Sequence, residues 1–110
     1  MIEDLLVSLV DRFNRRTQEN PGVREELRGR DRIIQLNFTD AGAFTLELKE
    51  GKLSPPRIGN GHDPQVKITT DTTTFQSLVK KEIGPIKAMY SGKLRIDASL
   101  EDKLLLRRLL

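Results

Sequence analysis

Residues 66–96 read VKITTDTTTFQSLVKKEIGPIKAMYSGKLRI, and this stretch carries the most complete set of structural signals in the chain. Apolar and polar residues alternate in 66–70 and again in 94–98, which is typical of half-buried strands. Between them, Asp71 is a good N-cap for a helix, and Pro85 is well suited to begin a second, short helix. The stretch therefore predicts a strand, a helix, a short helix and a strand, in that order.

The residues before this stretch predict a helix followed by strands. From 2 to 13, apolar residues recur at three- and four-residue spacing, which predicts an amphipathic helix, and 23–27 adds further helical turns. Residues 34–38 and 44–48 alternate cleanly, so one face of the sheet should be buried and the other wet. Residues 52–58 are extended, and their two consecutive prolines place them at an edge of the sheet.

The residues after the stretch predict a last helix with an unusual apolar surface. Ser99 and Asp102 have the spacing of a capping box, in which side chains satisfy the first helical N–H groups. Leu104, Leu105 and Leu106 are consecutive, so they span roughly 200° of the helix surface, whereas a surface helix needs an apolar stripe of only about 100°. We therefore expect this helix to contact core, a ligand or a second protomer on more than one side.

Composition bounds the fold and the compartment. The chain has 110 residues, no cysteine, and a net charge of +3 with acids and bases interspersed. This length suits one domain, 1–110, of the α+β class, with a mainly antiparallel five-stranded sheet and helices packed on one face. The absence of cysteine excludes disulfides and thiolate sites. Acidic residues at positions 3 and 4 argue against a signal peptide, and the absence of a long apolar run argues against a membrane span. We expect a cytoplasmic protein.

No constellation of catalytic, metal-binding or cofactor-binding residues stands out. His62 is the only histidine and lies beside a turn, so no metal ligand set forms around it. Gly59-Asn60-Gly61 lacks the third glycine of a dinucleotide fingerprint, because position 64 is proline. The arginines from 12 to 32 are mixed with acids and have no aromatic residue to stack on bases. We therefore expect no enzyme activity, no metal, no cofactor and no nucleic-acid partner.

The segments 66–71, 75–78 and 85–96 together resemble the type-two sterol carrier protein family, and the order of elements agrees over the whole chain. The resemblance implies a five-stranded sheet with helices over one face and, between them, a hydrophobic tunnel for sterols, fatty acids, acyl-CoA or phospholipids. It also implies a domain that is non-enzymatic in itself. Asp97-Ala98-Ser99 stands where the family commonly runs into a Gly-Asp pair.

The expected function is the binding and transfer of an apolar lipid-like ligand, such as a fatty acyl, sterol or isoprenoid lipid. The alternative is an accessory or dimerisation module of the same fold without lipid, and plain core packing competes with tunnel lining at each apolar position. Transient membrane contact and homodimerisation through the last helix stay open. The candidate tunnel residues are Phe38, Phe44, Leu46, Phe75, Leu78, Ile83, Ile86, Met89, Tyr90, Leu94, Ile96, Leu104 and Leu105.

Overall fold

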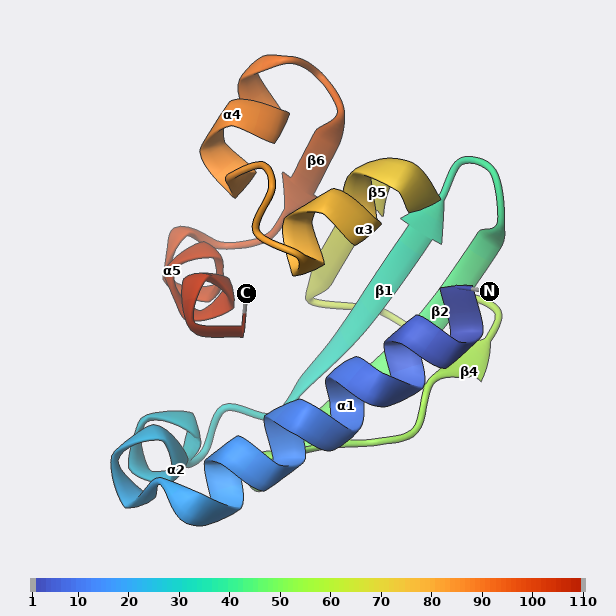
Figure 1. The fold of residues 1–110 in the computed structure, drawn as a ribbon. Coiled ribbons are helices and arrows are strands. Elements are labelled where there is room, and N and C mark those ends of the chain that lie inside the picture. The colour runs from blue at the N-terminus through green and yellow to red at the C-terminus, as the bar shows by residue number, and fades with distance from the viewer. Residues whose placement is uncertain (1, 110) are drawn as a thin grey trace.

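The structure, a computed structural model, describes the backbone of residues 2–109 and the side chains of residues 2–106. In this part of the chain, helices and strands follow the predicted order (Figure 1). The elements are α1 (Ile2–Glu19), α2 (Pro21–Leu27), β1 (Arg32–Phe38), β2 (Gly42–Lys49), β3 (Lys52–Leu53), β4 (Arg57–Ile58), β5 (Val66–Thr70), α3 (Thr72–Val79), α4 (Pro85–Tyr90), β6 (Leu94–Asp97) and α5 (Leu100–Leu109).

The strands form one mixed sheet with the order β3-β2-β1-β5-β6, and β4 also pairs with β2. Four of the pairings are antiparallel, while β1 and β5 run parallel, with Leu36 opposite Ile68. The predicted α+β class and mainly antiparallel sheet are confirmed. The predicted count of five strands is wrong, because the prolines at 55 and 56 divide the extended segment 52–58 into β3 and β4, which makes six.

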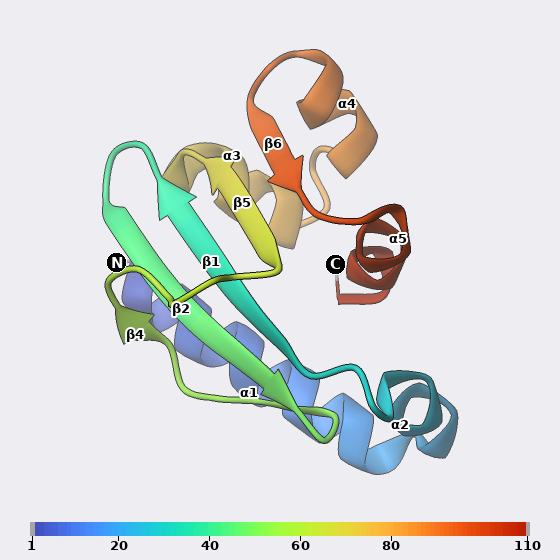
Figure 2. The same ribbon diagram turned by 180° about the vertical axis from the view of Figure 1, so that it is seen from behind.

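The main hydrophobic core lies between the sheet and the helices on one of its faces. Helices α1 and α3 lie in front of the sheet in Figure 1 and behind it in Figure 2. Phe38 on β1 meets Phe44 on β2 and Phe75 on α3 edge-to-face, with ring centroids 5.9 and 5.2 Å apart. Such aromatic contacts stabilise a core beyond their area alone. Leu6 of α1 is among the most fully buried side chains of the same cluster.

The opposite face of the sheet is less wet than the alternation predicts. Gln35 and Thr45 point to this face and are nevertheless buried, because residues 59–65 run across it (Figure 2). The Thr45 hydroxyl donates to the carbonyl of Gly59 at 2.8 Å. A Cβ atom at Gly61 would lie only 2.8 Å from Cγ2 of Ile33, so the loop packs directly on the strands. The expectation of a solvated face is thus wrong at its centre.

The predicted N-cap of α3 is confirmed. One carboxylate oxygen of Asp71 accepts from the Thr74 N–H at 2.7 Å, and the other accepts from the Thr74 hydroxyl at 2.8 Å. These hydrogen bonds lower the pKa of Asp71. Asp40, from the β1–β2 turn, accepts from the hydroxyl and the N–H of Thr72, and these bonds lower its pKa in the same way. Two carboxylates therefore fix the start of α3.

We predict that Asp71→Ala lowers the free energy of unfolding by about 1 kcal/mol at neutral pH, the usual effect of losing a helix cap. Because the pKa is lowered in the folded state, this stabilisation is present above the ordinary value of 3.8 and is lost as the pH falls through the lowered value. Urea unfolding at several pH values measures the difference. Asp71→Asn, which caps without titrating, should keep the stability at neutral pH and lose only the part of the acid dependence that Asp71 contributes, because Asp40 still titrates. Equal stability of Asp71→Ala and the unmodified chain at neutral pH would contradict the assignment.

Candidate ligand-binding groove

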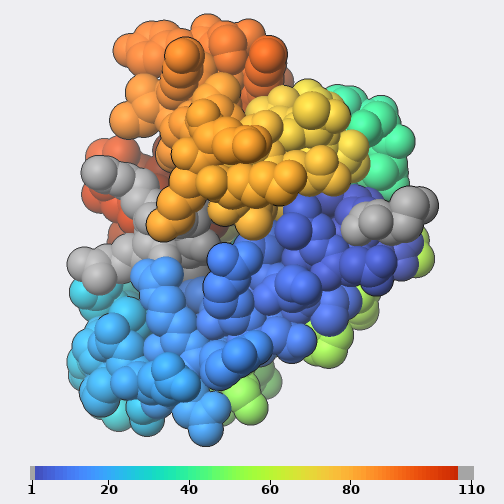
Figure 3. Space-filling model, in the orientation of Figure 1, coloured from blue at the N-terminus to red at the C-terminus, as the bar shows by residue number. Residues whose placement is uncertain are grey.

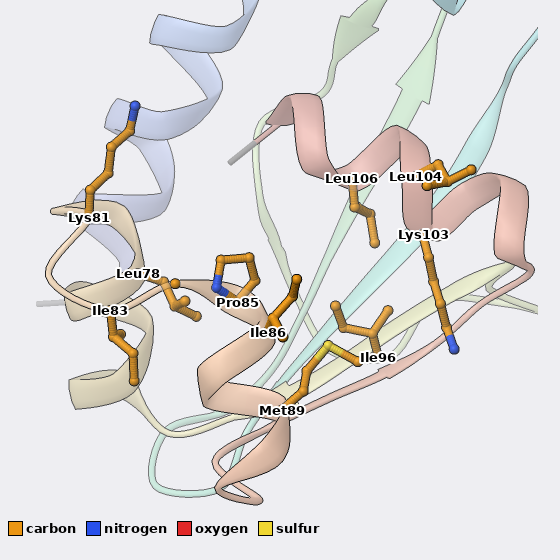
Figure 4. A pocket seen from close by; sticks show the side chains of 11 residues that line it. Leu78, Lys81, Ile83, Pro85, Ile86, Met89, Ile96, Lys103, Leu104 and Leu106 are labelled. Carbon is orange, nitrogen blue, oxygen red and sulfur yellow. The ribbon is translucent and has the colours of Figure 1, made fainter.

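A groove of about 590 Å³ opens between the α3–α4 turn, α4, β6 and α5 (Figure 4). The side chains of Ile86, Met89, Ile96 and Leu106 point toward one another across it. Most of the lining is apolar, and its volume lies in the usual range for small-ligand sites. The lining residues are Leu78, Lys81, Ile83, Gly84, Pro85, Ile86, Met89, Ile96, Lys103, Leu104 and Leu106.

The walls of this groove leave large apolar side chains in water. Ile86 is 65% exposed, Met89 40% and Leu104 54%. Burying such a side chain contributes about 1.5–3 kcal/mol, and these residues forgo much of that term. An apolar patch around a concavity marks a binding site more often than a scattered exposed leucine does. The exposed apolar side chains along the groove therefore indicate a site where a ligand could bind.

A small cluster of buried residues lies beneath the groove. Leu78 of α3, Ala88 of α4 and Leu94 of β6 are buried together, apart from the main core. Ala88 is the only buried residue of α4, so this helix rests on the sheet edge through one small side chain. The main core, by contrast, is filled by the side chains of α1, α3 and the central strands.

Local sequence signals explain where α4 begins and ends. Gly84 is its N-cap, and Pro85 takes the first helical position, as predicted. At the other end, Gly92 adopts a positive φ of 76°, a conformation that L side chains rarely adopt. The N–H of Lys93 then donates to the carbonyl of Ala88 at 2.9 Å. The chain can therefore turn back at once into β6, which keeps α4 short.

Helix α5 forms the other wall and is held by charge at its N-terminal end. The Nε of Arg32 donates to both carboxylate oxygens of Asp102, at 2.9 and 3.0 Å. Arg30 and Glu101 form a second ion pair. The Asp102 N–H donates to the Ser99 hydroxyl, which confirms the predicted cap.

The three consecutive leucines of α5 take three different places. Leu106 is buried in the main core and also lines the groove, and Leu105 is partly buried against that core. Leu104 lies on the rim of the groove, exposed. The wide apolar surface of this helix thus divides between core and groove, while the side chains of Leu109 and Leu110 lie outside the described residues.

We predict that Asp102→Ala destabilises the protein by about 2–3 kcal/mol, because it leaves the guanidinium of Arg32 partly buried without its carboxylate. The same change should also make α5 less firmly held and lower the affinity for any ligand bound in the groove. Glu101→Ala is the matched control on the neighbouring position; its pair is exposed, so the loss should stay below about 0.5 kcal/mol. Chemical unfolding of both variants tests this, and equal losses would show that the buried pair does not hold α5.

The structure brings only part of the predicted site together. Six of the expected residues line the groove: Leu78, Ile83, Ile86, Met89, Ile96 and Leu104. The others lie elsewhere: Phe38, Phe44, Leu46 and Phe75 in the main core, Leu94 in the small cluster, Leu105 against the main core, and Tyr90 in solvent.

Sequence reasoning missed several lining residues. The sequence predicts Pro85 only as the start of a helix and Leu106 only as part of the leucine run, and it gives no site role to Gly84. Lys81 and Lys103 had no signal at all, because an exposed lysine in a charged sequence is ordinary.

Within residues 2–109, no group of histidine and acidic residues is placed to hold a metal ion. His62 is exposed, with its Nε2 3.3 Å from a carboxylate oxygen of Asp63. None of the helices in that same region is long and apolar enough to cross a membrane.

The architecture is that of a small α+β domain, with helices over one face of the sheet and an apolar groove between two helices at its edge. The chain belongs to the SCP-2 sterol transfer family, whose model matches residues 10–110. No curated protein matches the chain in sequence. The predicted resemblance to the type-two sterol carrier proteins is confirmed.

Solved structures share the fold at low sequence identity. Sterol carrier protein 2 like 2 from Aedes aegypti has a TM-score of 0.64 and 18% identity, covering 96% of this chain and 97% of that one. A UbiJ-SCP2 ubiquinone synthesis protein has a TM-score of 0.68 and 14% identity, covering 98% and 87%. The sec-alkyl sulfatase PisA1, as a double mutant, has a TM-score of 0.71 and 20% identity; all of this chain matches, but only 16% of the sulfatase is covered.

Proposed function

We propose that the protein binds and transfers a lipid-like ligand whose hydrocarbon chain lies in the groove between α4 and α5. The observation that carries the proposal is the 590 Å³ apolar groove with exposed walls, in a chain of the SCP-2 sterol transfer family. A hydrocarbon chain laid along Ile86, Met89 and Leu104 would remove their apolar surface from water, which is the dominant favourable term in such binding.

The proposed place of the ligand is the edge of the sheet rather than the space under α1. Under α1, Phe38, Phe44 and Phe75 pack against one another at aromatic contact distances. Interiors packed in this way hold few voids larger than a water molecule. An internal tunnel would require this cluster to open, whereas the groove is already present.

The charge around the groove favours an anionic amphiphile, such as a fatty acid, over a neutral sterol. Lys81 and Lys103 are part of the lining, on opposite sides of it, and in Figure 4 the Lys81 side chain extends outward toward α1. Either ammonium group could pair with an acidic head group while the hydrocarbon chain covers the apolar residues between them.

The second candidate function is an accessory or dimerisation module without lipid. Leu100 and Leu104 are exposed on α5, where a second copy could cover them. The sulfatase match also shows this fold as a small part of a longer chain. Both observations fit a module that serves another protein or domain.

Titration with a fluorescent fatty acid, followed by displacement with an unlabelled fatty acid or a sterol, tests the proposal. We expect saturable binding that the fatty acid displaces more strongly than the sterol, and a co-purified lipid in native mass spectrometry. Sedimentation is run in parallel. A folded chain that shows no saturable binding and sediments as a dimer would establish the accessory function instead.

A further inference from the structure

We propose that α4 and the lysines around it form a docking surface for an anionic membrane, which places the mouth of the groove against the bilayer. This inference rests on the proposed lipid function and adds the surface through which the ligand would be exchanged. Helix α4 forms one end of the molecule, on the far side of α3 from α1 (Figures 1 and 3).

The apolar part of this surface consists of exposed side chains of α4: Tyr90, and Ile86 and Met89 at the mouth of the groove. Tyr90 is 89% exposed, and Ile86 and Met89 are exposed beside it. A tyrosine has an apolar ring and a polar hydroxyl, so it suits the interface between water and lipid. Ala88 is the only fully buried residue of α4, so the helix keeps much of its apolar surface in water.

The charged part is strongly one-sided. Lys87 on α4 and Lys93 just after it are exposed, as is Lys80 before it, and Glu82 is the single acidic residue from 80 to 94. Lys81 is exposed too, but its side chain extends toward α1 (Figure 4). Among the residues that the structure describes, no ion pair is recorded for these lysines. Exposed apolar side chains flanked by lysines are typical of segments that insert shallowly into anionic membranes.

The same charge argues against a second copy of this chain as the occupant. Two copies related by a twofold axis would bring like-charged lysines together, which is unfavourable across an interface. An anionic bilayer provides negative charge for the lysines and an apolar layer for Ile86 and Tyr90. Ile86 and Met89 also line the groove, so docking through them would open a continuous apolar path from bilayer to groove.

The chain carries its own probe for this contact. Tyr90 is the only tyrosine, and there is no tryptophan, so intrinsic tyrosine fluorescence reports on α4 alone. We expect vesicles of phosphatidylcholine mixed with phosphatidylglycerol to protect this fluorescence from acrylamide, and brominated lipids to quench it. Vesicles of phosphatidylcholine alone should protect much less, and high salt should reverse the protection. Unchanged quenching in the presence of anionic vesicles would overturn the proposal.

Charge variants distinguish binding through the surface at α4 from attraction due only to the net positive charge of the chain. Lys87→Gln with Lys93→Gln should lower binding to anionic vesicles, measured by co-sedimentation, by about five-fold for each lysine. The control, Lys49→Gln with Lys52→Gln, removes the same charge around the β2–β3 turn and should change little. Equal losses in both pairs would overturn the assignment to α4.

Fatty acid titration without vesicles separates this proposal from the proposed function. Lys87 and Lys93 do not line the groove, so their variants should bind the fluorescent fatty acid as the unmodified chain does. A protein that binds the fatty acid in solution but ignores anionic vesicles would refute the docking surface alone. Sedimentation as a dimer through α4 would refute it in favour of a second copy.

Discussion

Replacing Met89 and Leu104 together by aspartate is expected to lower the affinity for a fatty acid by about 30-fold or more. Each aspartate would be covered by the hydrocarbon chain, and removing a polar group from water without a partner costs about 1–3 kcal/mol on protein scales, or about five-fold or more for each aspartate. Both side chains are exposed when the groove is empty, so the melting temperature should barely change. Titration and thermal unfolding of the same samples measure the two effects.

Val7→Asp is the matched control for this double variant. Val7 is 47% exposed on α1 and is not part of the groove, so a charge there should leave the affinity for the fatty acid unchanged. If Val7→Asp weakened binding as much as the double variant, or if the double variant bound normally, the ligand would not lie between α4 and α5.

Phe38→Ala is expected to lower the free energy of unfolding by about 3–5 kcal/mol, the usual result of removing a buried aromatic side chain. Phe38 is at the centre of the aromatic cluster and meets both Phe44 and Phe75. The alanine would leave a cavity between β1 and α3. With a typical stability of about 5–15 kcal/mol, the loss would be a large fraction of the total.

The folded fraction of such a variant should still bind the fatty acid, because Phe38 does not line the groove. Where the alanine variant is too unstable to study, Phe38→Leu gives a milder core defect for the same comparison. Denaturant unfolding and titration are the two readouts. Lost binding at nearly unchanged stability would place Phe38 in an internal tunnel, and the core assignment would fail.

Much of the fold could be predicted, because its signals are local. The alternation of apolar and polar residues located the long strands. Asp71 and Ser99 marked helix starts because their side chains accept hydrogen bonds from the first helical N–H groups, and Pro85 did so because it has no N–H to leave unpaired. The parallel pairing of β1 with β5 and the loop over Thr45 were not predictable in this way. Both depend on contacts between segments far apart in the chain.

The groove was harder to predict than the fold, because grooves and cores are lined by the same residue types. Phe75 and Leu78 share one apolar stripe on α3, yet Phe75 packs in the main core and Leu78 lies under the groove. Periodicity indicates which side of a helix faces inward, not whether a neighbour fills the space beyond it. Tyr90 fits a helical apolar pattern and is in solvent, because α4 is too short to bury more than Ala88.

Photo-crosslinking with a diazirine-bearing fatty acid tests the central claim most directly. The carbene inserts into whatever surrounds the hydrocarbon chain, and peptide mass spectrometry locates the labelled residues. We predict labels within 83–89 and 103–106, on the two walls of the groove, that excess unlabelled fatty acid removes. Competable labels on α1 and around Phe38 and Phe44 instead would show that the ligand lies beneath the helices, and would contradict the groove as the binding site.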